Sequence, residues 1–233
     1  MSKYLEPTPW DRRNFPIDTY QLTEYSEAAL KETDQVEGHF TMKVDPLVNK
    51  ALLHQYGFYY TDTLTDLVVT RDRFFAEKAT DAVTFSKDYP AGEVLAIAEE
   101  AFQGGRYHRD FQVPDHLADL RYRNWVKDLI EQERILVYKQ AGQVDGFFAY
   151  KDDDVLLMAM HQRVRGKGFA IPFAAACIKE QFARTEAERL TAPISPRNMA
   201  SMNVFIGLGF NIGGCVDIYH KVNGSFGGDV QKV

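Results

Sequence analysis

The sequence predicts a fold that combines helices and strands (α/β in the broad sense, α+β in the strict one), because helical and β-rich segments alternate along most of its 233 residues. Apolar residues recur at helical spacing through residues 114–132, which predicts a helix with one buried face. Residues 134–138 and 146–150 flank Ala141-Gly142-Gln143 in the arrangement of a β-hairpin. An apolar fraction of 45% is ordinary for a folded protein. We therefore expect a packed core built from both kinds of element.

The front of the chain predicts a small α/β unit. Residues 39–44 have strand character, and Asp45 followed by Pro46 has the pattern of an N-cap and a first helical residue. We expect that helix to end before Gly57, with β-rich sequence following at residues 58–70.

A charged stretch at residues 71–78 predicts the join to a second, larger unit. We expect an N-terminal domain at residues 1–78, a second domain at residues 79–223 and a flexible, Gly-rich tail at residues 224–233. The elements expected in the second domain are a strand at 83–85, helices at 92–102 and 114–132, the hairpin, a strand at 155–160, a helix at 168–184, a strand at 189–192, a helix at 196–208 and a strand at 216–222.

Composition excludes several classes of protein. The formal charge is −6 with a pI near 5.5, and no dense basic stripe points to nucleic acid. No apolar segment has the length of a signal peptide or a membrane span, so we expect a cytoplasmic protein that does not bind membranes. The six histidines lack metal-binding spacing, and the two cysteines suit buried thiols, so we expect no metal site.

The strand at 155–160 leads into a short turn that is rich in glycine and cations. Gly166 and Gly168 allow the main chain to approach a bulky anion, and Arg163, Arg165 and Lys167 add positive charge. A helix opens directly afterwards, and such a helix start binds phosphate. The alternative is a solvated turn without a ligand. A dinucleotide fingerprint would need a third glycine, and a P-loop would need Ser or Thr after its lysine.

Two motifs in this region resemble a known superfamily. The positions of Arg165, Gly168 and Ala170 match Gln/Arg-x-x-Gly-x-Gly/Ala, which is motif A of the GNAT acetyltransferases. Residues 198–210 follow the superfamily pattern Asn-x-x-Ala-x-x-x-Tyr-x-x-x-Gly-Phe, with Ser201 and Phe205 at the Ala and Tyr positions. The resemblance covers residues 83–222. It implies a mixed, mostly antiparallel, splayed sheet flanked by helices, and the activity of an acetyl-CoA-dependent N-acetyltransferase.

The resemblance also implies where acetyl-CoA, the acyl donor, binds. The pantetheine arm would pair with the strand that carries Met158 and Met160, and Asn198 and Phe205 would line the thiol end. The pyrophosphate would lie on the amides of Arg165, Gly166, Lys167, Gly168, Phe169 and Ala170. Pro172 departs from the pattern, because a proline early in the helix removes a hydrogen bond and predicts a distorted first turn.

The proton-transfer groups are less well defined by the sequence. The tyrosine that serves as the acid in many members of the superfamily is Phe205 here, and phenylalanine has no proton to give. Tyr219 on the last strand is the candidate replacement, although an aromatic residue on a strand usually packs in the core. His161, at the end of the predicted cofactor strand, is a further candidate because histidine is a common acid–base residue, but a hydrogen-bonded turn histidine is the simpler interpretation. Water or the incoming ammonium remain open alternatives.

The acceptor is predicted by a looser resemblance. Pro9-Trp10-Asp11 and the loop at residues 105–109 resemble the TDP-fucosamine acetyltransferase family, which implies a nucleotide-linked amino-deoxysugar as acceptor. Arg106, Tyr107 and Arg109 are the candidate substrate-binding residues, since guanidinium groups bind phosphate or carboxylate in a bidentate manner. Alternatively, these charges pair with Asp110 and Asp115 on the surface.

The helix–Gly–strand sequence at residues 53–60 echoes that at residues 205–212. This suggests a partial GNAT-like N-terminal domain, with a chance likeness between two common turns as the alternative. The acceptor alternatives are another small amine, such as an amino acid, polyamine or antibiotic, or a peptide N-terminus. A non-catalytic acyl-CoA-binding module is the alternative from a different class. We expect a small-molecule partner and a homodimer.

Overall fold

The computed structural model describes residues 2–227. It divides into two compact units whose sequences interleave: unit 1 comprises Met1–Leu64, Gln103–Trp125 and Cys215–Val233, and unit 2 comprises Thr65–Phe102 and Val126–Gly214. The long strands β4 (Tyr59–Thr70) and β10 (Asn211–Asn223) and the helix α6 (Asp115–Glu131) contribute residues to both units. The contiguous domains expected at residues 1–78 and 79–223 stay a prediction.

Unit 1 is built on the strands β1, β2, β3, β10 and β4 in that spatial order. Pairing is antiparallel between β1 and β2 and between β3 and β10, and parallel between β2 and β3. The bounds of these strands are β1 (Leu5–Pro7), β2 (Thr19–Leu22) and β3 (Gly38–Val44). The helices of unit 1 are α1 (Pro9–Arg12), α2 (Glu27–Glu32), α3 (Ala51–Gln55) and α5 (Arg106–Arg109).

Unit 2 contains the sheet order β4, β9, β8, β7, β6, β5. Its ladders are antiparallel except between β8 and β9, so the predicted fold class, a mixed and mostly antiparallel sheet with helices, is confirmed. Its elements are η1 (Ala76–Lys78), β5 (Phe85–Ser86), α4 (Ala91–Ala101), β6 (Ile135–Gln140), β7 (Gln143–Lys151), β8 (Asp154–Met160), the 3-10 turn η2 (Gln162–Val164), α7 (Ala170–Thr185), β9 (Arg189–Ile194) and α8 (Met199–Ile206).

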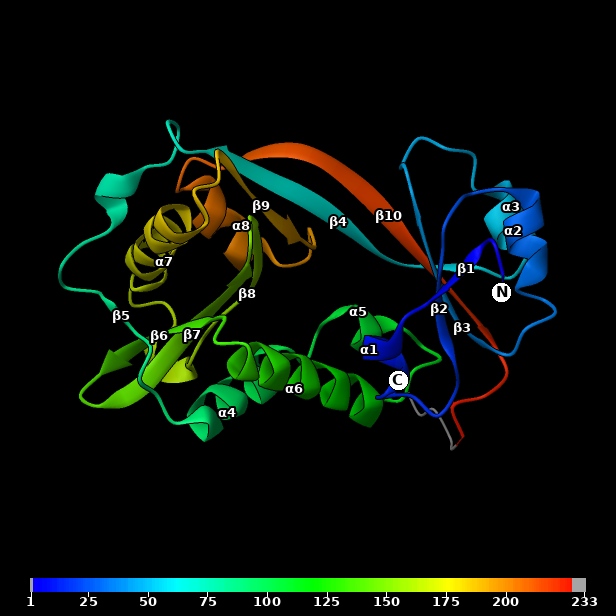
Figure 1. Cartoon of the computed structure of the whole chain (residues 1–233), viewed down its shortest axis with the longest axis horizontal. Coiled ribbons are helices and arrows are strands. Elements are labelled where there is room, and N and C mark those ends of the chain that lie inside the picture. Colours follow the sequence, from blue (N-terminus) through cyan, green and yellow to red (C-terminus); the bar gives the residue numbers. More distant parts are fainter. Residues whose placement is uncertain (1, 228–233) are drawn as a thin grey trace. The chain divides into compact units, whose positions relative to one another are not determined.

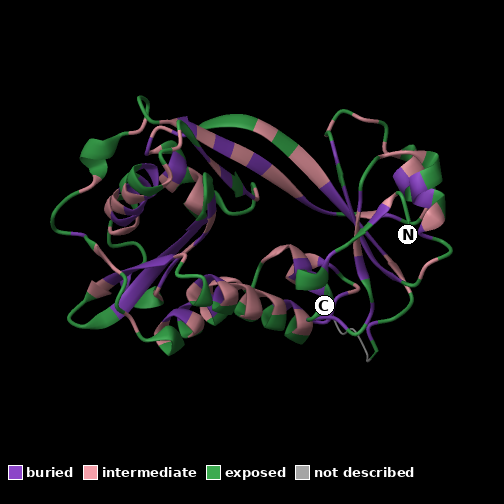
Figure 2. Ribbon diagram, viewed as in Figure 1, coloured by how far each residue is buried: buried purple, intermediate pink, exposed green. Residues whose placement is uncertain are grey.

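The unit 2 sheet is covered on both faces, with α7 on one and α4 on the other (Figure 1). The alternation of strand side chains explains this arrangement. Phe148 of β7 packs in the same cluster as Phe173 of α7, whereas the ring of its neighbour Phe147 lies 6.2 Å from that of Phe102, just after α4. Strand β7 is accordingly buried from Val144 through Tyr150, as Figure 2 shows.

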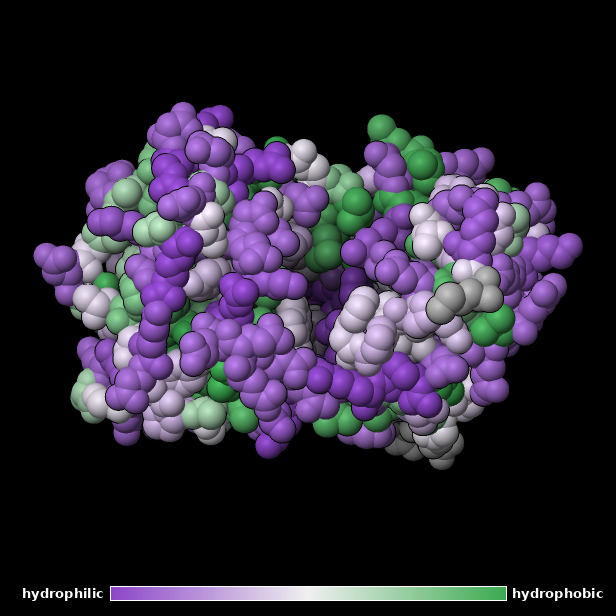
Figure 3. All heavy atoms as spheres, in the orientation of Figure 1, coloured by the Kyte–Doolittle hydropathy of each residue, from purple (hydrophilic) through white to green (hydrophobic). Residues whose placement is uncertain are grey.

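Polar residues cover most of the face seen in Figure 3, and the apolar residues there form small separate groups. Within residues 2–227, no helix is both long enough and apolar enough to cross a membrane.

The helix predicted to follow Asp45 forms only at Ala51–Gln55. The carbonyls of Asp45 and Pro46, which a continuing helix would use, instead accept hydrogen bonds from Lys50 Nζ. The side chain of Asn49 then accepts the amide of Ala51 at 2.8 Å and starts the helix there. Local side-chain bonds of this kind compete with helix propagation.

Other differences are smaller. The expected strand at 83–85 is displaced to Phe85–Ser86, the loop around Arg106 contains a helical turn, and the short elements before residue 38 were not predicted. The tail predicted from residue 224 is described only as far as residue 227, where Phe226 is buried, and residues 228–233 lie outside the described part.

Candidate active site

The candidate cofactor site begins where β8 and β9 separate. Strand β8 pairs with β7 from Asp154 to Met160, but among the described residues its parallel ladder with β9 contains a single register pair, Asp154 with Thr191. Beyond Asp154, the backbone edge of β8 that faces β9 is therefore not used by a ladder. An extended ligand with amide groups can pair with such an edge.

The turn after β8 is held by hydrogen bonds of its own residues. The ring of His161 accepts the amide of Arg163 at 3.2 Å, and the guanidinium Nε of Arg165 donates to the carbonyl of Met160 at 2.7 Å. The two glycines have φ angles of 73° at Gly166 and 84° at Gly168, in the region that favours glycine. A Cβ atom at either glycine would meet nothing within 4 Å, so the turn faces open space.

Helix α7 begins at Ala170 and presents unsatisfied amides to this turn. Within residues 2–227, no acceptor is in hydrogen-bonding geometry to the backbone N–H groups of Gly166, Gly168, Phe169 or Ala170. Together with the helix dipole, these groups form an anion-binding site.

Pro172 is the third residue of α7, and the first turn is regular: Phe173 donates its amide to the carbonyl of Phe169 at 3.1 Å. A proline this early removes an N–H that has no intrahelical acceptor in any case. The predicted distortion of the first turn is therefore wrong.

The three cations of the turn have different roles. Arg163 forms an ion pair with the buried carboxylate of Asp145 at 2.5 Å and also donates to the carbonyl of Val144 at 2.8 Å, so it anchors the turn to β7. Arg165 and Lys167 are exposed on either side of Gly166. They can therefore add positive charge to a bound anion.

The two other predicted cofactor residues on α8 have structural roles. Asn198 is the N-cap of α8, and its side-chain oxygen accepts the amide of Ser201 at 3.1 Å. Phe205 is only 2% exposed and meets Phe210 edge to face, with ring centroids 5.1 Å apart. Unit 2 thus contains all the predicted cofactor residues, including Met158 and Met160, and it brings the turn residues together around one helix start.

Tyr219 lies in unit 1, so it is not brought together with the cofactor turn within one compact unit. It is buried in the apolar cluster that contains Phe40, and its ring is 5.9 Å from His54 and 5.8 Å from Tyr60. Burial, with the nearby carboxylate of Asp217, raises the pKa of the Tyr219 hydroxyl. Like any tyrosine, it is protonated at neutral pH, as a general acid must be, but the raised pKa makes it a weaker acid than an exposed tyrosine.

The predicted acceptor residues also lie in unit 1. Tyr107 is 1% exposed and donates its hydroxyl hydrogen to Asp11 at 3.2 Å, and Arg109 forms an ion pair with Asp62 at 2.6 Å. By contrast, Nε of Arg106 is buried and has no hydrogen-bond acceptor among residues 2–227. Arg109 is already held in its ion pair with Asp62, so Arg106 is the candidate whose guanidinium has a donor without a described acceptor and no described ion pair.

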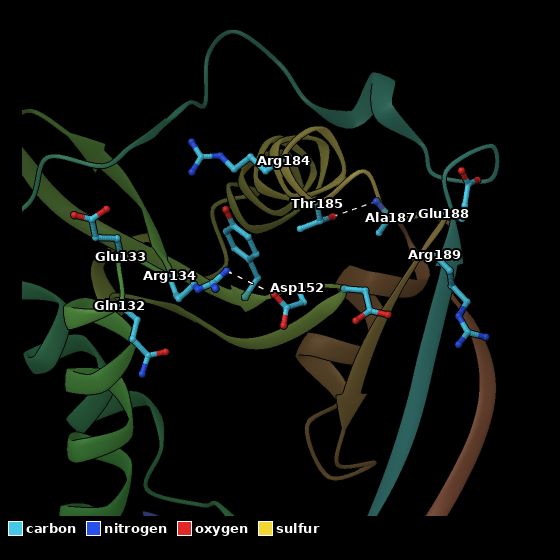
Figure 4. Close-up of a pocket in the computed structure, with 11 residues that line it drawn as sticks. Gln132, Glu133, Arg134, Asp152, Arg184, Thr185, Ala187, Glu188 and Arg189 are labelled. Carbon is cyan, nitrogen blue, oxygen red and sulfur yellow. Dashed lines mark hydrogen bonds and ion pairs between the residues drawn. The ribbon is translucent and has the colours of Figure 1, made fainter.

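A cavity of about 750 Å³ lies elsewhere in unit 2 (Figure 4). It is lined by Gln132, Glu133, Arg134, Tyr150, Asp152, Asp153, Arg184, Thr185, Ala187, Glu188 and Arg189. Arg184 and Thr185 end α7, whereas the turn lies at its start. The 16 residues of the helix separate the two regions by about 24 Å. The cavity therefore does not belong to the candidate cofactor site.

A buried polar cluster formed by His39, Asp110 and His220 in unit 1 was not expected from any sequence pattern. Burial alone raises the pKa of Asp110, but hydrogen bonds from His220 and His39 outweigh it and hold the pKa below its usual range. Burial and the neighbouring His39 lower the pKa of His220 to about 3, against the opposing effect of Asp110. Asp110 is thus ionised and His220 neutral near pH 7. The members are too far apart in sequence for any local motif to reveal them.

Residues 98–211 match the family model of the acetyltransferase (GNAT) domain. Among solved structures, the chain is similar to a GCN5-related N-acetyltransferase from Sphaerobacter thermophilus, with 11% identity, coverage of 94% of this chain and 76% of that chain, and a TM-score of 0.58. It is also similar to a conserved protein of unknown function from Staphylococcus epidermidis, with 12% identity, coverage of 96% and 92%, and a TM-score of 0.65.

A third similar structure is the glucosamine N-acetyltransferase region of a fungal multi-domain GH3 β-N-acetylglucosaminidase, with 12% identity, coverage of 88% of this chain and 30% of that chain, and a TM-score of 0.59. At these identities the likeness establishes the fold. No protein of curated function matches the sequence. The stretch similar to the GNAT acetyltransferase domain is slightly less than half of the chain, and the enzyme class of that domain is N-acetyltransferase.

Proposed function

We propose that this protein transfers an acetyl group from acetyl-CoA to the primary amine of a small molecule, with a nucleotide-linked amino-deoxysugar as the leading acceptor class. The observation that carries the proposal is the start of α7. There, four backbone amides have no acceptor among residues 2–227. They follow strand β8, which separates from β9 and leaves its facing backbone edge without a ladder. A phosphate-bearing ligand with an extended amide arm suits both features at once.

The residues of the turn fit the pyrophosphate of CoA. Positive φ angles at Gly166 and Gly168, and the empty space where their Cβ atoms would be, let phosphate oxygens approach the backbone. Arg165 and Lys167 supply charge from the exposed side. The pantetheine amides would pair with the edge of β8 that carries Met158 and Met160. Asn198 and Phe205 stay predictions for the thiol end.

Acetyl-CoA supplies the activated acyl group when bound, and the chain supplies orientation and polarisation. Backbone N–H groups on the open edge of β8 can donate to the thioester carbonyl, as donors in an oxyanion site do. Phe205 cannot protonate the leaving thiolate. We propose Tyr219 for this role, because a tyrosine hydroxyl is protonated at neutral pH and can donate that proton to the thiolate.

The acceptor proposal rests on two observations. Pro9-Trp10-Asp11 and the loop at residues 105–109 resemble the TDP-fucosamine acetyltransferase family, and one structural neighbour is described as a glucosamine N-acetyltransferase region. Arg106, with a buried Nε that has no acceptor among residues 2–227, is the residue that we propose for the acceptor's phosphate. Tyr107 and Arg109 would support it through their bonds to Asp11 and Asp62.

The test is to measure free CoA thiol released from acetyl-CoA with a panel of amines, and to identify the acetylated product by mass spectrometry. We expect turnover with nucleotide-linked amino-deoxysugars and slower turnover with amino acids, polyamines and peptides. The Arg106→Ala variant should raise KM for the nucleotide-linked acceptor by more than about tenfold, with KM for acetyl-CoA unchanged.

The panel also separates the alternatives. Turnover with other amines and none with amino sugars would contradict the acceptor class while keeping the chemistry. Tight acetyl-CoA binding without turnover on any amine would favour a non-catalytic acyl-CoA-binding module, for which the absence of a tyrosine at position 205 is the motivation.

A further inference from the structure

Unit 1 buries three potential metal ligands against one another. His39 of β3, Asp110 after α5 and His220 of β10 are 1%, 0% and 0% exposed. In the β3–β10 ladder His220 faces Thr41, two residues from His39, so the two histidines are diagonal neighbours on one face of the sheet. The loop after α5 brings the carboxylate to the same point.

The three facing atoms lie close enough together to bind one metal ion, provided that the shortest edge widens from its hydrogen-bond length toward the separation of about 3.4 Å between tetrahedral ligands. His220 Nδ1 lies 2.6 Å from Asp110 Oδ2, His39 Nε2 lies 3.2 Å from His220 Nδ1, and His39 Nε2 lies 3.5 Å from Asp110 Oδ2. A triangle with these edges has a circumscribed radius of about 1.8 Å, which is shorter than metal–ligand bonds of about 2.1 Å. A point about 1 Å out of its plane is therefore about 2.1 Å from all three atoms.

We propose that His39, Asp110 and His220 form a binding site for a first-row divalent transition-metal ion, with Zn²⁺ as the ion that fits the donor set most directly. The carboxylate oxygen is a hard ligand, but the two imidazole nitrogens are borderline ligands, and they favour Zn²⁺, Fe²⁺ or Ni²⁺ over Mg²⁺ and Ca²⁺. Three protein ligands leave at least one coordination position open.

The hydrogen bonds among His39 Nε2, Asp110 Oδ2 and His220 Nδ1 use the lone pairs of these three atoms less fully than a bound metal ion would. His220 Nδ1 carries at most one hydrogen, and the short distance to Asp110 indicates that this N–H donates to the carboxylate. His39 Nε2 lies 3.5 Å from the same carboxylate, so the hydrogen bond that it donates there is a long one. One cation at the centre would accept a lone pair from each atom.

The surroundings orient the carboxylate in the way that outer-shell residues orient a metal ligand. Its other oxygen, Asp110 Oδ1, accepts hydrogen bonds from the Tyr59 hydroxyl and the Gln112 amide, both at 2.9 Å. The rings of Phe15 and Phe226 lie 5.9 and 6.0 Å from that of His39, and they form an apolar wall that limits the access of water.

One feature weakens the site. When His220 Nδ1 binds an ion, the ring hydrogen moves to Nε2, which is buried and has no acceptor among residues 2–227. We therefore expect an affinity below that of structural zinc sites, whose outer-shell hydrogen bonds are complete. The site was not expected from the sequence, because its three residues are distant along the chain and only the fold brings them together.

The test is a titration of the untagged, EDTA-treated full-length protein with Zn²⁺ against a chromophoric chelator, followed by absorption spectroscopy with Co²⁺. We expect stoichiometric Zn²⁺ binding, a rise in Tm on adding Zn²⁺, and Co²⁺ d–d bands typical of N/O coordination. Loss of outer-shell residues alone weakens metal sites by about 10–100-fold, so His39→Gln should weaken Zn²⁺ binding by more than about 100-fold.

The matched control is His54→Gln, which removes an exposed histidine from the same unit and should leave Zn²⁺ affinity unchanged. Equal loss in both variants would overturn the proposal, and so would a wild-type protein without stoichiometric Zn²⁺ binding, a Tm response or Co²⁺ bands. In the latter case the cluster is a hydrogen-bonded core network only. If His39→Gln does not fold, the Tm response and Co²⁺ spectrum of the wild-type protein decide the question.

Discussion

Gly168→Glu is the substitution that most directly probes the start of α7. Gly168 has a φ angle of 84°, its amide has no acceptor among residues 2–227, and a Cβ there would enter open space. The first carbon of the new side chain would therefore meet no protein atom within 4 Å. It would instead place a carboxylate and added bulk where the pyrophosphate of CoA is proposed to bind.

Two effects contribute, and their sizes can be compared. A non-glycine residue at this φ costs about 1 kcal/mol of folding stability. A carboxylate about 4 Å from a phosphate charge is repelled by about 4 kcal/mol near a protein surface, and salt and exposure reduce this to about 3 kcal/mol. Since about 1.4 kcal/mol is tenfold in affinity, CoA binding should weaken by more than about 100-fold, while the protein still folds.

The matched control is Gly142→Glu at the tip of the β6–β7 hairpin. Gly142 has a φ angle of 81°, and a Cβ atom added there would also meet nothing within 4 Å, so strain and added charge are the same. Isothermal titration calorimetry with CoA, with circular dichroism as a check of folding, should show normal affinity for Gly142→Glu alone. Unchanged CoA affinity in a folded Gly168→Glu protein, or equal loss in both variants, would refute the assignment of the turn.

Two further substitutions concern proton transfer. Tyr219→Phe should lower kcat by about 100-fold without changing KM for acetyl-CoA, because it removes a proton donor and keeps the ring packing; steady-state kinetics with unchanged kcat would exclude Tyr219 as the acid. Phe205→Tyr should lower the free energy of unfolding by about 1–3 kcal/mol in urea denaturation, because the buried ring would carry a hydroxyl without a partner. A gain in kcat without loss of stability would show instead that position 205 reaches the thiol.

The elements of unit 2 were largely predictable because local signals agree with the tertiary structure. The predicted hairpin forms, with positive φ at Ala141 and Gly142, and the Gly-rich turn before α7 uses the positive φ that glycine permits. The helix after Asp45 was mispredicted, because Lys50 and Asn49 bind the backbone groups that helix propagation needs.

The polar groups of unit 1 could not be predicted, because their partners are distant in sequence. Arg109 was expected either to bind substrate or to pair locally, but its partner is Asp62. Tyr107 is buried against Asp11, almost a hundred positions earlier. His39 and His220 meet only because β3 and β10 are adjacent strands. Local sequence carries the anion-binding turn, whereas these contacts depend on the tertiary packing of elements that are distant in sequence.

The most direct test of the central claim is a crystal structure of the protein with CoA. We predict that the pyrophosphate oxygens accept hydrogen bonds from the amides of Gly166, Gly168, Phe169 and Ala170, with the pantetheine arm along the edge of β8 that faces β9. CoA bound elsewhere, such as in the cavity at the far end of α7, would contradict the assignment.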